Sequence, residues 1–539
     1  MTTEQLPEGS PVALPGDHHV NPKDEARLKA GAVGLFGVLF MAVANAAPIT
    51  AMSFNVPIAV GFGNGTGASA GFLFATIVLT IFTIGFIAMA RYITTTGAFY
   101  GFISQGLGQV WGMASGLLAA VAYIIFEGSL IGGFAYFASD TLSSSLNISV
   151  NWLPIAIVGI VVIALLSYYS ITLAAGILSV TLISEVVLLL ALGISVLVKG
   201  GPDGLSTGSP FNISKGFSDL PAGAFGTSVA AGTAAVGIFF AFWSWIGYET
   251  TAVYGEESKE PKKIVPRATL IAVIGLGLFY TFMSWMVVAG NGAANAITTS
   301  AGASPVDIWL NLVKGNLGTF PLGIYKVLLI VGSFACAMAF HNAASRYLYA
   351  MGREAAWPAI RNSLGKVNIK HGSPATASFV QSGITLVLTL LFFQFTHVLV
   401  PDANGGPSVD TPALVPYVNL YGILALIGTA MILLVQTFTS FAVISYFWVK
   451  KTHKGNVITT LLCPLVGAAG MLYALFLLWQ NRAFAAGLAS DSLIMTSMPY
   501  IILVLVVLGF GYAFWVKSAK PEIYAEIGQT TLQEAHERV

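Results

Sequence analysis

Long apolar runs recur along the whole chain and are separated by short polar segments. A helix needs roughly 20 apolar residues to cross a bilayer core about 30 Å thick. Runs of this length predict about twelve transmembrane segments in chain order, at residues 31–60, 70–91, 111–138, 152–171, 176–199, 231–254, 268–290, 322–350, 374–399, 415–448, 457–479 and 496–517. The pattern therefore predicts an all-α polytopic membrane protein.

Composition agrees with this prediction and excludes a soluble fold. Hydrophobic residues make up 56% of the 539 positions, only 9% are charged, and the mean hydropathy is +0.81. A soluble domain carries about 25% charged residues. The net charge of +1 gives no reason to expect a nucleic-acid partner.

The distribution of Lys and Arg orients the chain. If the N-terminus is inside, 19 of the 24 Lys and Arg residues fall on the inner side. Cytoplasmic loops carry such an excess of positive charge. We therefore expect both termini in the cytoplasm and the protein in the cytoplasmic membrane, with five basic residues outside: Lys199, Lys215, Lys314, Lys326 and Arg482.

Segments 1 and 6 do not have the pattern of continuous helices. Segment 1 contains Pro48 in mid-membrane, and proline lacks the backbone N–H that a helix interior needs. Segment 6 alternates small and bulky residues around Gly247. For either segment alone, a proline kink or a packing glycine is the simpler explanation. Their matching positions in two possible five-segment halves favour a transporter site between inverted repeats.

Two breaks at one depth would create a site for a zwitterion. Backbone that is not helical survives inside a membrane only where protein, water or ligand satisfies it. N–H groups at a half-helix N-terminus suit a carboxylate, and C=O groups at a half-helix C-terminus suit an ammonium group. We expect the substrate to contact both breaks, at Asn45, Ala46, Ala47, Ile49, Thr50, Trp243, Ser244, Trp245, Ile246 and Gly247.

Three motifs resemble the amino acid–polyamine–organocation superfamily. Residues 242–249 read Phe-Trp-Ser-Trp-Ile-Gly-Tyr-Glu, and the loop at 256–267 follows the pattern Glu-Glu-x-Lys-x-Pro-x-x-x-x-Pro. The second motif lies at 343–354, with Pro358 after it, and the third joins segments 2 and 3 at 90–100. The resemblance covers segments 1 to 10, and the loop after segment 6 is its most specific part.

This resemblance implies a leucine-transporter-like fold with a five-plus-five inverted repeat, discontinuous helices 1 and 6, and alternating access. It places Trp243 at an aromatic gate over the substrate and Glu249 where a relative has an acidic residue tied to proton sensing. One departure concerns the first break. Many members have a Gly-Ser-Gly-type triplet there, whereas this chain has Asn45, Ala46 and Ala47 before Pro48.

The chain then divides into six parts, and two further helices follow the repeats. These parts are a cytoplasmic tail (1–30), a first repeat with segments 1–5 (31–200), an external loop (201–230), a second repeat with segments 6–10 (231–450), segments 11–12 (451–517) and a second cytoplasmic tail (518–539). The first tail lacks the apolar core of a signal peptide. Cys336 and Cys463 both lie in apolar runs, so we expect no disulfide, metal site or cofactor.

Glu185 is the leading candidate for coupling to an ion. Ionisable groups at membrane depth are costly and mark function. Some proton-coupled relatives have a lysine here, beside the place where a sodium ion sits between segments 1, 5 and 8 in sodium-coupled cousins. Burial favours the neutral form of a carboxyl group, as a proton carrier requires. The alternatives are a structural, neutral glutamic acid, or a sodium site made by Glu185, Ser345 and carbonyls of segment 1.

Glu127 and His341 also lie at membrane depth. If Glu127 faces the substrate, its carboxylate would favour a second amine on that substrate. Otherwise it pairs with a polar neighbour on another helix. For His341 we expect a packed, hydrogen-bonded side chain.

These observations favour a secondary transporter that imports amino acids by proton symport, with sodium not excluded as the coupling ion. The alternatives are an amine or amino acid exchanger and a permease for polyamines or other cationic substrates. A membrane sensor or intramembrane enzyme is more remote, because no output domain, nucleophile–base pair or metal cluster stands out. The sequence contains no phosphate-binding loop, so we do not expect direct use of ATP. The expected partners are a small-molecule substrate and the lipid bilayer, and the sequence carries no signal for an oligomeric state.

Overall fold

The computed structural model describes residues 28, 30–169, 171–302, 304–368, 370–400 and 407–528, and for 171–175 it describes the backbone. Most of the first predicted cytoplasmic tail and half of the second lie outside these ranges. Only Leu28 and Ala30 of the first tail are described, and the second tail is described as far as Gly528.

Eleven helices within the described ranges are long and apolar enough to cross a membrane. They correspond to all the predicted segments except segment 6. That segment is not among them because its helix stops at Trp243, so no continuous stretch reaches the necessary length. The described residues otherwise include two short antiparallel strands, β1 (Leu399–Val400) and β2 (Val409–Asp410). The predicted all-α membrane fold is confirmed.

The first five segments contain seven helices, because segment 1 is broken and a short helix precedes segment 3. They are α1 (Leu35–Ala46), α2 (Pro48–Ile58), α3 (Ala68–Ala90), α4 (Phe99–Leu107), α5 (Gln109–Leu146), α6 (Trp152–Tyr169) and α7 (Ile171–Lys199). Ala47 separates α1 from α2 with a left-handed φ of 43°. Pro48 then occupies the first position of α2, where its missing N–H costs nothing.

The remaining segments are continuous apart from segment 6. Their helices are α8 (Ala234–Trp243), η5 (Tyr248–Ala252), α9 (Pro261–Asn291), α12 (Thr319–Arg353), α14 (Ala375–Phe395), η7 (Pro416–Ile423), α15 (Leu424–Ile444), α16 (Cys463–Ala486) and α17 (Leu493–Ala519). Shorter helices lie in the connections: α10 (Ala293–Ser300), α11 (Asp307–Leu317), α13 (Pro358–Arg361) and α18 (Pro521–Glu526).

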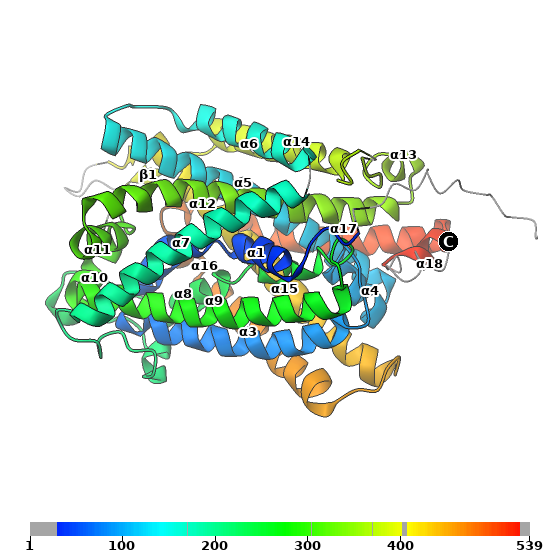
Figure 1. Ribbon diagram of the computed structural model, residues 1–539, viewed down its shortest axis with the longest axis horizontal. Helices are drawn as coiled ribbons and strands as arrows, with labels where there is room; N and C mark the ends of the chain where they lie inside the picture. Colours follow the sequence, from blue (N-terminus) through cyan, green and yellow to red (C-terminus); the bar gives the residue numbers. More distant parts are fainter. Residues whose placement is uncertain are drawn as a thin grey trace, which may run out of the picture.

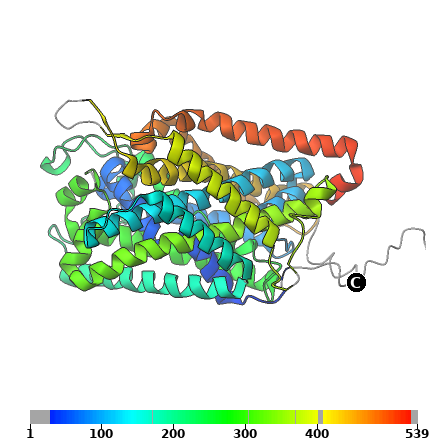
Figure 2. The same ribbon diagram turned by 90° about the horizontal axis from the view of Figure 1, so that it is seen from above.

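Two packed groups of helices surround the broken ones. Helices α5, α6, α12 and α14 contact one another and form the four-helix group, whereas α3 packs against α8 and α9, which in turn contact α1 or α2. In Figure 1, α6 and α14 lie along one side of the molecule and α3 along the opposite side. Helix α17, drawn in red, runs along the edge of the bundle in Figure 2 and exposes apolar side chains such as Leu503 and Val507.

The two ends of the bundle carry different connections. Helices α4, α13 and α18 lie at one end in Figure 1, and α10, α11 and β1 lie at the other. The first set comes from loops predicted to be inside and the second from loops predicted to be outside. The alternation of the chain between the two ends therefore agrees with the predicted order of the segments.

Candidate functional site

The break in segment 1 frees backbone carbonyl groups, and other helices satisfy them. The thiol Sγ of Cys336 lies 3.2 Å from the Asn45 carbonyl oxygen and donates to it. The Tyr280 hydroxyl donates to the carbonyl oxygen of Ala46 at 2.9 Å. These contacts keep the left-handed Ala47 in place, because buried carbonyl groups without partners would be costly at membrane depth.

The break in segment 6 follows Trp243 and ends at Gly247, whose φ is 110°. The Gly247 N–H donates to Glu249 Oε2 at 3.0 Å, and the Gly247 carbonyl accepts from the Thr250 hydroxyl at 2.6 Å. A Cβ atom on Gly247 would collide with Asn45. The two breaks therefore touch each other, as their matched positions predict.

A small cavity lies between the breaks, with a volume of about 30 Å³. This is room for one or two water molecules, so a substrate needs its walls to move. None of the described residues that line it carries a formal charge. Seven of the predicted substrate contacts line it: Asn45, Ala46, Ala47, Thr50, Trp243, Ser244 and Ile246.

The cavity also has lining residues that sequence reasoning missed. They are Ala51, Asn55, Phe126, Leu130, Cys336, Phe340 and Tyr421. Most follow a helical spacing of four, from Ala47 through Ala51 to Asn55, from Phe126 to Leu130, and from Cys336 to Phe340. Residues at this spacing share one helix face, so extending the predicted contacts of segment 1 along its face would have found Asn55.

Three predicted contacts lie close to the cavity but do not line it. Ile49 is fully buried, and its N–H points to Glu185. The Trp245 ring packs edge-on against Tyr280, with ring centroids 5.0 Å apart. Gly247 is covered by Asn45. These three residues pack against the breaks on the side away from the cavity.

Aromatic rings close the cavity on the side of α2. Phe54 packs against three other rings, with centroid distances of 5.2 Å to Trp243, 5.4 Å to Tyr417 and 4.7 Å to Tyr421. We call these four residues the aromatic cluster. Trp243 and Tyr421 also line the cavity, so the cluster covers the site toward the end of the bundle that carries α10.

Glu185 lies where segments 1, 5 and 8 meet. Its Oε2 accepts a hydrogen bond from the Ile49 N–H at 3.3 Å, in the first turn of α2. A Cβ atom on Gly332 of α12 would collide with Oε1, so the carboxyl group also touches segment 8. The side chain is 2% exposed. The N-terminus of α2 stabilises a carboxylate here, so the site accommodates both the charged and the neutral form of Glu185.

Glu249 belongs to the far side of the break in segment 6. One carboxyl oxygen accepts from the Tyr123 hydroxyl at 2.9 Å, and the other accepts from the Gly247 N–H. Glu249 therefore connects the broken backbone of segment 6 to segment 3 and does not line the cavity.

A comparison with known proteins fits this geometry. The sequence profile described as "Amino acid permease" matches residues 33–508. The chain belongs to this family. It is 23% identical over 333 residues to the branched-chain amino acid permease BcaP of Bacillus subtilis (strain 168). That match covers 58% of this chain and 65% of the relative, so the chain spans just under two thirds of the length of BcaP.

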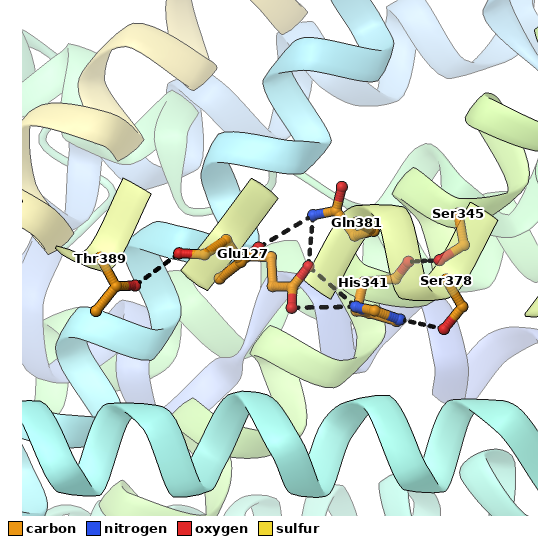
Figure 3. A network of polar contacts seen from close by, with 7 residues as sticks. Glu127, His341, Ser345, Ser378, Gln381 and Thr389 are labelled. Carbon is orange, nitrogen blue, oxygen red and sulfur yellow. Dashed lines mark hydrogen bonds and ion pairs between the residues drawn. The ribbon is translucent and has the colours of Figure 1, made fainter. Parts of the chain in front are cut away.

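In this permease, Glu127 does not face the cavity. Both of its oxygens lie 3.1 Å from His341 Nδ1, and one accepts from the Gln381 side-chain amide (Figure 3). His341 Nε2 contacts the Ser378 hydroxyl at 2.7 Å. The neighbouring Phe126 lines the cavity, and one residue further along a helix is a rotation of about 100°. Glu127 therefore points into the four-helix group.

Ser345 lies apart from Glu185. Its hydroxyl donates to the His341 carbonyl oxygen at 2.6 Å. Gly332, which touches Glu185, precedes Ser345 by thirteen residues on α12, a rise of roughly 20 Å. The structure does not bring Ser345 and Glu185 into one sodium site. Within the described ranges, no group of three or more His, Cys, Asp or Glu side chains could hold a metal ion.

Two ion pairs close the permease at the end that carries α4 and α13. Arg346 binds Glu257 at 2.6 and 2.9 Å, and Arg353 binds Glu256 at 2.7 and 3.1 Å. We call these four residues the ion-pair layer. It joins the loop after segment 6 to the end of α12.

Backbone contacts extend the ion-pair layer to two further segments. Glu256 also accepts from the Thr96 N–H at 2.9 Å, between segments 2 and 3. Burial alone would raise the pKa of Glu256, but the Arg353 guanidinium and the Thr96 hydrogen bonds outweigh it and hold that pKa below its ordinary value. The Glu257 carbonyl accepts from the Val33 N–H at 3.0 Å, next to the start of α1. The layer thus holds both broken segments closed at this end.

Proposed function

We propose that this permease is a secondary active transporter that imports neutral amino acids with aliphatic side chains across the cytoplasmic membrane. It works by proton symport and alternating access, with both termini in the cytoplasm. The observation that carries the proposal is the cavity between the two breaks, whose described lining residues include polar groups but no formal charge.

Polar groups suited to a zwitterion lie on the broken helices. The N-terminus of α2 is the positive end of a half-helix and favours the substrate carboxylate. Asn55 Nδ2 donates to the Ser244 hydroxyl at 2.8 Å, while its Oδ1 has no hydrogen-bond partner among the described residues. An unpaired buried acceptor is costly, so Asn55 Oδ1 is a candidate acceptor for the substrate ammonium group.

The substrate side chain is expected to be neutral and apolar. Glu127 would have favoured a second amine, but its carboxyl group faces His341 and Gln381 instead. Phe126, Leu130 and Phe340 give the cavity an apolar wall. The name of the relative BcaP, a branched-chain amino acid permease, supports an aliphatic side chain for the substrate of this chain as well.

Glu185 is the proposed carrier of the coupling proton. Its carboxyl group contacts Ile49, in the same first turn of α2 as the cavity-lining Thr50. When protonated it adds no charge to the buried junction of segments 1, 5 and 8, and when ionised it is stabilised by α2. A rearrangement of segment 1 during transport would change that balance and couple proton release to substrate movement.

Alternating access requires that the two closures open in turn. The aromatic cluster covers the cavity at the end predicted to be outside, and the ion-pair layer closes the end predicted to be inside. Both closures include residues of broken or adjacent segments, namely Phe54 and Trp243 in the first and Glu256 and Glu257 in the second. A substrate larger than the present cavity can enter only after one closure has opened.

Uptake into proteoliposomes tests this proposal. Labelled leucine, valine, lysine and putrescine are offered separately, with and without an inward proton gradient and in the absence of sodium. We expect the neutral aliphatic amino acids to accumulate above their external concentration only with the gradient. Accumulation of lysine or putrescine instead would overturn the substrate class. Uptake that needs preloaded amine and no gradient would make the permease an exchanger.

A further inference from the structure

The contacts of Glu127 form a closed polar site inside the four-helix group. Glu127 belongs to α5, His341 to α12, and Ser378 and Gln381 to α14 (Figure 3). The side chains of Glu127 and His341 are both 0% exposed. Gln381 also lies 3.4 Å from the Thr385 hydroxyl, one turn further along α14. The site is separate from the substrate cavity, and none of these five residues lines that cavity.

The hydrogen-bond donors and acceptors of Glu127 and His341 indicate what the site binds. A carboxylate only accepts hydrogen bonds, so His341 Nδ1 must carry a hydrogen when Glu127 is ionised. If Nε2 carries none, the pair has a net negative charge in a fully buried place, which is expensive. One additional proton on Nε2 makes the pair neutral, and this N–H then donates to the Ser378 hydroxyl at 2.7 Å.

Among the described residues, the surroundings supply no other charge to balance the pair. The sequences of α14 and of α15, which also packs against α5, contain no ionisable residue. Other ionisable groups nearby on α5 and α12 have partners elsewhere: Tyr123 bonds to Glu249, Tyr347 to the Phe99 N–H, and Arg346 to Glu257.

Ionisable groups on the remaining neighbours lie near the ends of those helices or contact other residues. Glu185 of α7 meets α12 at Gly332, nine residues from His341, which is roughly 13 Å along the helix. Tyr168 and Tyr169 end α6, Tyr100 of α4 bonds to Glu354, and Tyr417 and Tyr421 of η7 belong to the aromatic cluster. Lys517 and Tyr512 lie in the last two turns of α17, and Tyr500 of the same helix is exposed.

Gln381 fits either protonation state of Glu127. In the structure its amide Nε2 donates to the carboxylate, and its Oε1 has no partner among the described residues. If the amide is turned over, Oε1 accepts from a protonated Glu127 instead. In both orientations of the amide the proton remains within the site, and the other polar side chains keep their positions.

We propose that Glu127 and His341 together bind one proton, and that this bound proton fastens α14 to α5 and α12. Loss of the proton at alkaline pH leaves a buried negative charge, loosens α14 and slows transport. The proton is held in the four-helix group and is distinct from the coupling proton assigned to Glu185. A test of this inference by transport assay rests on the proposed function.

Amino acid exchange at equal pH on both membrane faces tests the inference without a proton driving force. The exchange is measured in a Glu185→Gln background, because loss of the coupling proton from Glu185 would itself slow exchange at alkaline pH. In Glu185→Gln we expect the exchange rate to fall about tenfold per pH unit on an alkaline limb, the slope of one proton. Adding Glu127→Gln, or Glu127→Gln together with His341→Gln, should remove this limb, because no buried charge can then form at the pair. Glu185→Gln without these further changes is the matched control and should keep it.

Several results would overturn the inference. They are a Glu185→Gln rate with no alkaline limb up to about pH 9.5, or a limb that survives when Glu127→Gln is added, alone or with His341→Gln. If the Glu127 variants do not fold, Ser378→Ala replaces them. Because it removes the acceptor of Nε2–H, we expect the limb to move to lower pH by about half a unit to one unit, and an unmoved limb contradicts us.

Deuterium exchange separates this inference from the proposed function, because it needs no substrate. After correction for the intrinsic pH dependence of amide exchange, α14 of the wild type should become less protected at alkaline pH, and α9 should not. Equal protection of α14 at all pH values would overturn the inference even in a transporter of amino acids. Loss of protection confined to α14 would support it even if no tested amino acid is exchanged.

Discussion

At the scale of single residues, Asn55 has an unmet hydrogen bond in the cavity. Its amide nitrogen is held by Ser244, and its Oδ1 has no partner within the described residues. Ser244 also donates to the Phe240 carbonyl oxygen at 2.9 Å, so it keeps a partner when Asn55 is changed. Replacing Asn55 therefore removes a polar group from the proposed substrate site without leaving Ser244 unpaired.

We expect Asn55→Leu to raise the KM for leucine by about tenfold or more, because one hydrogen bond to a charged group contributes about 1.5 kcal/mol or more. The measurement is initial uptake into proteoliposomes over a range of leucine concentrations. Asn481→Leu on α16, away from the cavity, is the control and should leave KM unchanged. Equal KM values for Asn55→Leu and the wild type would remove Asn55 from the substrate site.

Several residues of the site follow from sequence, and others depend on helix rotation. The proline in segment 1 and the glycine in segment 6 locate the breaks, and so identify neighbours such as Asn45 and Ser244. For Glu127, the direction of the side chain could not be predicted from the sequence. The sequence places it at the depth of the site, but only packing decides that Phe126 faces the cavity while Glu127 faces His341.

At the scale of elements, the two breaks form one unit because Gly247 lies directly against Asn45. Gly247 has a φ of 110°, and it has no room for a Cβ atom. Both conditions require glycine, since L-residues are strained in this conformation. The break in segment 6 therefore depends on this one residue for its shape and for its contact with segment 1.

We expect Gly247→Ala to cost about 1–3 kcal/mol of strain and to abolish transport. Gly275→Ala on α9 is the matched control, because a Cβ atom there meets no atom within 4 Å and its backbone is helical. Thermal unfolding in detergent and leucine uptake measure the two effects. Transport by Gly247→Ala at the rate of Gly275→Ala would show that the contact between the breaks is dispensable.

The long elements were predictable because a bilayer imposes a length of roughly 20 apolar residues on each helix. The short helices α4, α10 and α11 were not, since eight to eleven residues leave no such mark. The interruption of segment 6 was predicted as a break, but its extent was not. Whether the two halves are inverted repeats stays a prediction that the helix order alone does not test.

At the scale of the whole molecule, the permease is closed at both ends of its cavity. The ion-pair layer joins the loop after segment 6 to α12 and, through backbone contacts, to the start of α1 and to the loop after α3. A carboxyl group with a depressed pKa stabilises the folded state at pH values above its unfolded pKa. That contribution is lost as the pH falls through the folded pKa.

Glu256 is such a group, so acid should weaken the ion-pair layer. Below the ordinary value of 4.5, we expect the wild-type melting temperature to fall more steeply with pH than that of Glu256→Gln. At neutral pH the variant should melt a few degrees lower, because Arg353 loses its partner. Glu260→Gln is the control, since its exposed pair with Lys263 contributes little. Parallel pH dependences of Glu256→Gln and the wild type would contradict this account.

The central claim is that a neutral amino acid crosses together with a proton that Glu185 carries. Because the zwitterion has no net charge, symport must move one positive charge inward for each substrate, whereas exchange of neutral amino acids moves none. The most direct measurement is the current that a leucine pulse evokes in proteoliposomes on a solid-supported membrane, without sodium. We predict an inward positive current in the wild type and none in Glu185→Gln. A current of wild-type size in Glu185→Gln, or leucine transport by the wild type without current, would contradict the account.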